Sequence, residues 1–160
     1  SGKLDSLEQD SSLTDEQRKQ VEDMKNKLQS AKDSAQQQQE NEQKKSERRQ
    51  EFSGEMDELE SDDLKISSAA NAEDELAMTA SSFEQWDELL SEMYDYLAGV
   101  LNADQYASEE ENYKQWVAER DSGAENAASA TEDSTQKQLA SYSFKQSYTK
   151  ARCYKLLDMM

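Results

Sequence analysis

The sequence predicts an all-α protein, in which a long polar N-terminal helix is followed by a small antiparallel three-helix bundle. Two observations argue against a turn-rich β sandwich or barrel: the chain has no proline, and it has only four glycines in 160 residues. A third observation locates the core, because every aromatic residue except Phe52 lies from residue 83 onward. We therefore place the boundary of the bundle near residues 70–80, with an extension before it.

The extension has a tail and a helical part. Residues 1–13 are polar and rich in serine, which is typical of a tail or tether. Thr14 and Gln17 have the spacing of a capping box, so a helix is expected from there. Residues 14–66 form the long N-terminal helical segment. One helix is favoured over two because residues 36–50, although wholly polar, are mostly good helix formers. A continuous coiled coil is not expected with so polar a seam.

Residues 67–80 are expected to form a linker or a weak helix, and residues 81–160 the bundle, because three periodic segments with short connections favour antiparallel packing. The first helix begins at Ser81 or Ser82, which have capping spacing, and ends near 102–104. Its apolar face repeats at the helical period and consists of Trp86, Leu89, Leu90, Met93, Leu97, Val100 and Leu101.

The second helix is expected to begin at Ser108. Glu109, Glu110 and Glu111 then lie in its first turn, where the helix dipole favours negative charge. Its apolar face consists of Tyr113, Trp116, Val117, Arg120, Ala124 and Ala127. The third helix begins near Ser129 or Thr131 and runs to the C-terminus, with one stripe formed by Leu139, Tyr142, Gln146, Thr149, Cys153 and Leu156.

The net charge of −18 is concentrated in the middle of the chain. Residues 51–111 hold 19 acidic residues against the single cation Lys65, whereas residues 136–160 have a net charge of +4. Such a chain repels nucleic acids and anionic membranes. The charge favours a basic protein as the partner, because long-range attraction speeds association.

The residue types present exclude most catalytic and metal chemistry. Without histidine, the chain lacks the Ser-His-Asp and Cys-His arrangements and the usual zinc ligand sets. Cys153 is alone and lies among apolar residues, so we expect a buried, inert thiol. No run of residues is apolar enough for a membrane span. We expect neither a cofactor nor a metal, and no enzymatic activity.

Trp116 and Arg120 are four residues apart and share one face of the second helix. The arginine can stack on the indole ring or pair with an acid of another helix. Thr149 and Arg152 repeat this combination of polar residues in the third helix. These residues form either a recognition surface or internal polar contacts that fix the register of the helices, and the second interpretation is favoured.

Four elements of the sequence resemble the LprI-type lysozyme-inhibitor family: Asp87…Leu90, Tyr94-x-x-Leu97-x-x-x-Leu101, Trp116-Val117-x-x-Arg120-Asp121 and Thr149-x-x-Arg152-x-x-x-Leu156. The resemblance covers residues 83–157. The family has a cysteine shortly after its Arg-Asp pair, where this chain has Ser122, Gly123 and Ala124. The resemblance implies a small helical bacterial protein that is exported to the cell envelope, often as a lipoprotein, and that binds protein.

The resemblance also implies a basic lysozyme as the partner, and an inhibitor would need an acidic or polar loop to enter the substrate cleft. Two acidic clusters are the candidates, namely Asp57, Glu58, Glu60, Asp62 and Asp63, and then Glu109, Glu110 and Glu111. The alternative is a structural or adaptor protein of the envelope that uses its N-terminal helix as a spacer or self-association surface. In either case we expect an extracytoplasmic protein that meets the membrane only through a lipid anchor outside this chain.

Overall fold

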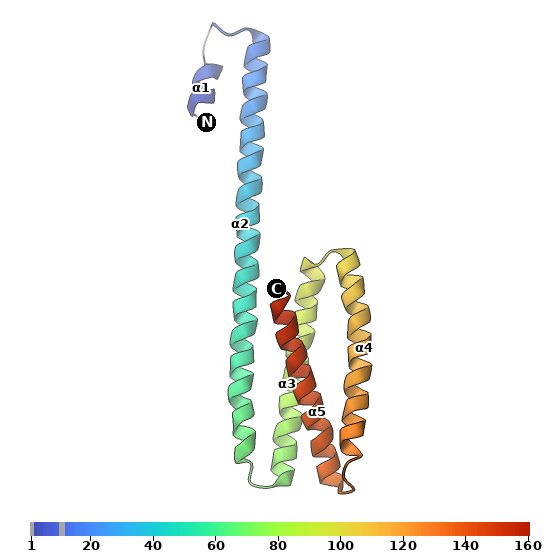
Figure 1. Ribbon diagram of the computed structural model, residues 1–160. Helices are drawn as coiled ribbons and strands as arrows, with labels where there is room; N and C mark the ends of the chain where they lie inside the picture. Colours follow the sequence, from blue (N-terminus) through green and yellow to red (C-terminus); the bar gives the residue numbers. More distant parts are fainter. Residues whose placement is uncertain (1, 10–11) are drawn as a thin grey trace. The chain divides into compact units, whose positions relative to one another are not determined.

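The all-α class is confirmed by a computed structural model that describes residues 2–9 and 12–160. These residues contain no strand. They form five α-helices, α1 (Gly2–Glu8), α2 (Asp15–Asp63), α3 (Ala72–Val100), α4 (Ala103–Ala128) and α5 (Ser134–Asp158), and one 3-10 helix, η1 (Leu64–Ser68) (Figure 1). The chain divides into two compact units, Ser1–Glu47 and Arg48–Met160.

The first unit contains α1 and the first part of α2. The prediction of a tail over residues 1–13 is wrong for Gly2–Glu8, which form α1, while residues 1, 10 and 11 lie outside the described part. Asp5 of α1 pairs with Lys25 of α2 at 2.5 Å between the carboxylate and ammonium atoms. This ion pair and its hydrogen bond lower the pKa of Asp5.

Helix α2 is one uninterrupted helix, as predicted. Its capping box is present, because the Gln17 amide N–H donates to Thr14 Oγ1 and the Thr14 amide N–H donates to Gln17 Oε1, at 3.2 and 2.9 Å. Side-chain hydrogen bonds between residues four apart run along the polar stretch, from Gln36 to Glu40, Gln37 to Asn41 and Gln43 to Glu47. These local bonds support the helix where it buries no apolar face.

In the second unit α5 packs against both α3 and α4, consecutive helices run in opposite directions, and the last part of α2 joins them (Figure 1). Phe52 and Met56 of α2 expose 0% and 1% of their surface, and the Phe52 ring packs edge-on against Tyr96 at 5.8 Å. The unit therefore begins at Arg48 rather than near residues 70–80. Since Phe52 and Met56 are four residues apart, they share one face of α2 and are buried together.

Helix α3 begins at Ala72, so of the two possibilities for residues 67–80 the linker is wrong beyond Asn71 and a helix forms there. The helix starts early because the Asn71 side chain accepts a hydrogen bond from the amide of Asp74 at 2.9 Å, and Asn is a favoured N-cap. Three acidic residues follow in the first turn, where the helix dipole stabilises them. The capping spacing at Ser81 and Ser82 therefore lies inside a helix.

Helices α4 and α5 begin at positions other than those predicted. Asn102 and Gln105 form a capping box, so α4 starts at Ala103 instead of Ser108. Asp133 caps α5 through the amide of Gln136, so α5 starts a few residues after Thr131. As a result, residues 109–111 lie beyond the first turn of α4.

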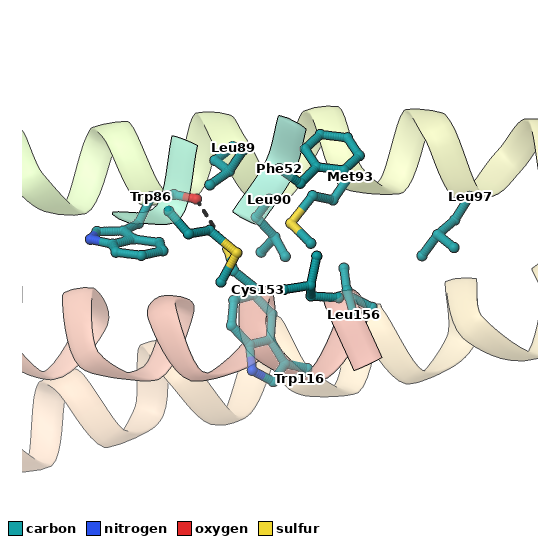
Figure 2. Close-up of a cluster of buried hydrophobic side chains, with 11 residues drawn as sticks. Phe52, Trp86, Leu89, Leu90, Met93, Leu97, Trp116, Cys153 and Leu156 are labelled. Atoms are coloured by element: carbon teal, nitrogen blue, oxygen red, sulfur yellow. Dashed lines mark hydrogen bonds between the residues drawn. The ribbon is translucent and has the colours of Figure 1, made fainter. Parts of the chain in front are cut away.

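The core forms where α3, α5, α4 and the end of α2 meet (Figure 2). The predicted faces are confirmed except at Val100, which is 38% exposed. Cys153 is fully buried and its thiol donates to the Trp86 carbonyl oxygen at 3.6 Å. Burial raises the pKa of this thiol to about 12, so it is inert at neutral pH.

Candidate functional site

Arg120 of α4 connects to α3 through charge and ring contacts. Its Nη1 lies 3.1 Å from Asp87 Oδ1, and its Nε lies 3.1 Å from Asp121 Oδ1. The guanidinium carbon is 5.3 Å from the centre of the Phe83 ring and 5.2 Å from that of Trp116. The guanidinium is thus held by two carboxylates and two rings, which fixes its position at the α3–α4 contact.

Arg152 of α5 is the centre of a second and more deeply buried network. Its Nη2 donates to Glu109 Oε1 of α4, and its Nε donates to the Tyr94 hydroxyl of α3 at 3.0 Å. The Tyr94 hydroxyl in turn donates to Glu109 Oε1 at 3.1 Å. Burial, opposed by Arg152 and assisted by Glu109, raises the pKa of Tyr94 to about 12. Three helices are therefore joined by one charged triangle.

A ladder of aromatic rings connects the two arginines. Stacked pairs run from Phe144 to Tyr148 (5.4 Å), from Tyr148 to Trp116 (5.6 Å) and from Trp116 to Tyr113 (5.8 Å). Tyr94 closes the ladder edge-on against Tyr113 at 4.7 Å. The ladder runs from α5 through α4 to α3, so it helps to fix the register of these helices.

Thr149 has no exposed surface, and its hydroxyl oxygen is the only buried side-chain polar atom without a hydrogen-bond partner among the described residues. With Trp116, Arg120, Asp121 and Arg152 it completes the motif that the sequence singles out. All five side chains lie at helix contacts within the second unit or beside them. A structural role for the motif stays our interpretation of these contacts.

Asp63 ends α2 inside a polar network with α3 and α5. Its carboxylate accepts hydrogen bonds from the Ser82 hydroxyl and, at 2.9 Å, from the Trp86 indole N–H. Lys150 Nζ lies 2.7 Å from Asp63 Oδ2 and 3.3 Å from Glu60 Oε2. Burial acts to raise the pKa of Asp63, but these hydrogen bonds outweigh it and the pKa is lowered.

The first predicted acidic cluster lies on helix α2 and not on a loop. Asp57 and Glu58 are exposed, and Asp62 pairs with Lys65 at 3.0 Å. Glu60 accepts from Lys150, and Asp63 is held as described above. A cleft-entering loop made of these residues is therefore not what the chain forms, and only part of the cluster is available to a partner.

The second predicted cluster is also helical. Glu109 is 8% exposed and is paired with Arg152, whereas Glu110 and Glu111 are exposed on α4. The sequence alone does not distinguish these three glutamates from one another. Glu109 differs from its neighbours because it pairs with Arg152, which lies at a buried position of α5.

An acidic hollow between α2 and α3 was not predicted. It has a volume of about 270 Å³, and four of its lining residues are glutamates: Glu55, Glu58, Glu88 and Glu92. None of the four has an ion-pair partner within the described residues. Burial and then the neighbouring Glu92 raise the pKa of Glu55, and Arg48 opposes this shift only in part. We refer to these four residues as the acidic face.

The spacing of the four glutamates in the sequence is consistent with the acidic face. Glu55 and Glu58 are three residues apart on α2, and Glu88 and Glu92 are four apart on α3, so each pair lies on one side of its helix. Leu59 and Leu89 line the same hollow. The apolar residues Leu59 and Leu89 favour contact between the two helices, and this contact brings the acidic pairs together despite their repulsion.

No group of histidine, cysteine, aspartate or glutamate side chains in residues 2–9 and 12–160 is arranged to hold a metal ion. None of the helices in the described part of the chain combines the length and the hydrophobicity that a membrane span requires.

Comparison with known proteins gives one match. The sequence model of the family described as "Lysozyme inhibitor LprI" matches residues 66–156, which is more than half of the chain. No curated protein and no solved structure matches. The matched segment contains α3, α4 and nearly all of α5, together with both arginine networks.

Proposed function

Because the chain belongs to the LprI lysozyme-inhibitor family, we propose that it is a non-enzymatic module that binds a basic lysozyme and inhibits it. The family match over residues 66–156 carries this proposal. The strong negative charge supports it, since attraction between an acidic inhibitor and a basic enzyme raises the rate of association. We further propose that the protein acts outside the cytoplasmic membrane, in the cell envelope, attached by a lipid anchor outside this chain.

The acidic face is the surface that we propose for lysozyme. Its four glutamates form no ion pair within the described residues, and the pKa of Glu55 is raised by burial and by nearby negative charge. A lysine or arginine of the partner would relieve this repulsion on binding. The hollow between the glutamates offers a place for such a side chain, with Leu59 and Leu89 beside it.

The positions of the acidic residues imply a manner of inhibition different from the loop insertion that the sequence suggests. Both predicted acidic clusters lie on helices, so we propose that a rigid helical face covers the substrate cleft in place of a loop that enters it. Of the residues predicted from sequence, Glu58 belongs to this face and Asp57 is its exposed neighbour on α2. Glu110 and Glu111 remain a separate candidate surface on α4.

The test is inhibition of a basic lysozyme by the purified chain at low and at physiological salt. The variant E55Q/E58Q/E88Q/E92Q removes four charges from the acidic face. The matched control E16Q/E22Q/E40Q/E42Q removes four exposed charges from the first unit. We expect the first variant to weaken inhibition about tenfold or more and the control to weaken it far less, because only the first removes contacts.

Three results would contradict parts of the proposal. Equal losses in the two variants would mean that net charge alone governs binding. Inhibition that E110Q/E111Q abolishes, while the acidic-face variant retains it, would move the site to α4. Inhibition no stronger than that of an unrelated acidic helical protein would leave the family's activity absent from this chain.

A second candidate function is favoured by α2. From Asp15 to Glu47 this helix is mostly exposed and is supported by its own side-chain hydrogen bonds, which suits a spacer about 50 Å long at about 1.5 Å per residue. Met24 and Leu28 are 55% and 48% exposed, which suits self-association. An envelope adaptor of this kind predicts a concentration-dependent mass in analytical ultracentrifugation, lowered by M24Q/L28Q, and no affinity for lysozyme.

A further inference from the structure

An open groove of about 440 Å³ lies between α4 and α5, apart from the acidic face. Its lining residues are Asn112, Gln115, Trp116, Glu119, Tyr148, Ala151, Arg152 and Lys155. The groove exists because Ala151 places only a methyl group between Tyr148 and Lys155, one helical turn to either side. Its volume is in the range of sites that bind small molecules or short peptides.

The two cationic side chains of this groove are not fully paired within the described residues. Lys155 is exposed and has no ion-pair partner within the described residues. Arg152 is 8% exposed, and its Nε and Nη2 are engaged by Tyr94 and Glu109. Its Nη1 has no hydrogen-bond partner in the described part of the chain. A guanidinium that is fixed on one edge and free at Nη1 is preorganised to bind an anion.

The one acidic lining residue is already bonded. Glu119 accepts from the Tyr148 hydroxyl at 3.1 Å and from Gln115 Nε2 at 3.2 Å, one bond on each carboxylate oxygen. Trp116 and Tyr148 each stack with two neighbouring rings, which favours contact between a ligand and the ring edges. Ring edges carry partial positive charge. In a chain of charge −18, this groove therefore offers donors and positive edges.

We propose that the groove binds the free carboxyl end of a short peptide. The carboxylate lies between the Lys155 ammonium and Nη1 of Arg152, and the side-chain amides of Asn112 and Gln115 bond the peptide groups. Asn112 is exposed and Gln115 has its amide oxygen unused, so the pair supplies both donors and an acceptor. This site is independent of the proposed lysozyme-binding face.

The probe is acetyl-triglycine, compared with the same peptide ending in a carboxamide, by amide chemical shifts of the full chain. We expect saturable shifts within residues 112–119 and 148–155 for the acid, and an affinity at least tenfold lower for the carboxamide. Equal affinity for the two peptides, shifts outside these residues, or no shifts at about 5 mM acid would overturn the proposal.

Variants test the assigned contacts. K155Q is expected to weaken binding of the acid about fivefold or more, E119Q to strengthen it, and K137Q, on the same helix outside the groove, to leave it unchanged. A151F fills the groove from an exposed position and should abolish binding while far-ultraviolet circular dichroism stays unchanged. If K137Q weakens binding as much as K155Q does, the attraction is non-specific and the site is not where we place it.

A carrier protein that ends in the same three glycines separates the sources of such a ligand. Binding of the carrier with the affinity of the free peptide would assign the groove to protein C-termini, and loss of binding would assign it to free short peptides. In both cases binding requires the free carboxylate of the ligand.

Discussion

Glu109 of α4 and Arg152 of α5 form an ion pair in which the two side chains expose only 10% and 8% of their surface. The Tyr94 hydroxyl bonds both partners, so the Glu109 carboxylate and one edge of the Arg152 guanidinium are paired inside the bundle. Such a pair adds little net stability compared with apolar residues, but losing one partner leaves an uncompensated buried charge.

The first prediction follows from the cost of leaving one of these two buried charges unpaired. E109Q should lower the free energy of unfolding by about 3 kcal/mol, because it leaves the Arg152 guanidinium buried without a counter-ion. E110Q, at the exposed neighbouring position, should change it by less than about 0.5 kcal/mol. Urea unfolding monitored by circular dichroism measures both. If E109Q lowers the free energy of unfolding no more than E110Q does, water molecules hydrate the Arg152 guanidinium in place of the Glu109 carboxylate.

The second prediction concerns the Thr149 hydroxyl, which is buried without a partner. T149V removes this hydroxyl while keeping the branched shape, so we expect a gain of about 1 kcal/mol in unfolding free energy. T149S keeps the hydroxyl and removes a methyl group, so it should lose about 1 kcal/mol. If T149V is destabilising, the hydroxyl has a partner such as a buried water molecule.

The third prediction concerns stability at acidic pH. The folded chain lowers the pKa of Asp63, whose unperturbed value is 3.8, because hydrogen bonds from Lys150, Ser82 and Trp86 outweigh the effect of burial. The stability from these bonds is therefore fully present above a pH of about 3.8 and is lost as the pH falls through the lowered pKa. D63N should be less stable than the natural chain at neutral pH.

The measurement is the urea midpoint at neutral pH and at a pH of about 3. Relative to the natural chain, D63N should lose less stability on acidification, since it has no carboxylate to protonate at this position. D62N removes a carboxylate that pairs with Lys65 at the surface, so it serves as the control and should lose as much stability on acidification as the natural chain does. Identical acid sensitivity of D63N and D62N would place the titrating groups elsewhere.

The sequence predicts the α3 and α5 faces well, because burial of Trp86, Leu90 or Leu156 follows directly from helical periodicity. It does not assign Phe52 to the bundle. Phe52 and Met56 follow a long polar stretch, and the sequence does not indicate which helix they pack against. The start of α4 shows a different difficulty. Asn102 and Ser108 both carry capping signals, and local sequence does not rank them.

The candidate sites were harder to predict than the fold. Charge runs such as 109–111 are visible in the sequence, but which member is buried depends on where Arg152 lies on another helix. The acidic face and the α4–α5 groove each combine residues of two helices. Their composition therefore depends on helix packing, which periodicity restricts without fixing the neighbours.

The last prediction concerns Gly123 of α4, which lies against the Phe144 ring of α5. A Cβ atom placed there would lie 2.2 Å from Cζ of Phe144, well inside van der Waals contact. The phenyl ring is held by its stack on Tyr148 and resists displacement. G123A should therefore lower the unfolding free energy by about 1–3 kcal/mol, although alanine is the better helix former.

Gly54 of α2 provides the matched control, because a Cβ atom there meets nothing within 4 Å. G54A should gain about 0.5–1 kcal/mol from helix propensity and reduced freedom of the unfolded chain. The double variant G123A/F144L should recover part of the loss, since a smaller side chain gives the new methyl group room. Stabilisation by G123A alone would show that the Phe144 ring moves aside at no cost, and that glycine is not required where these two helices meet.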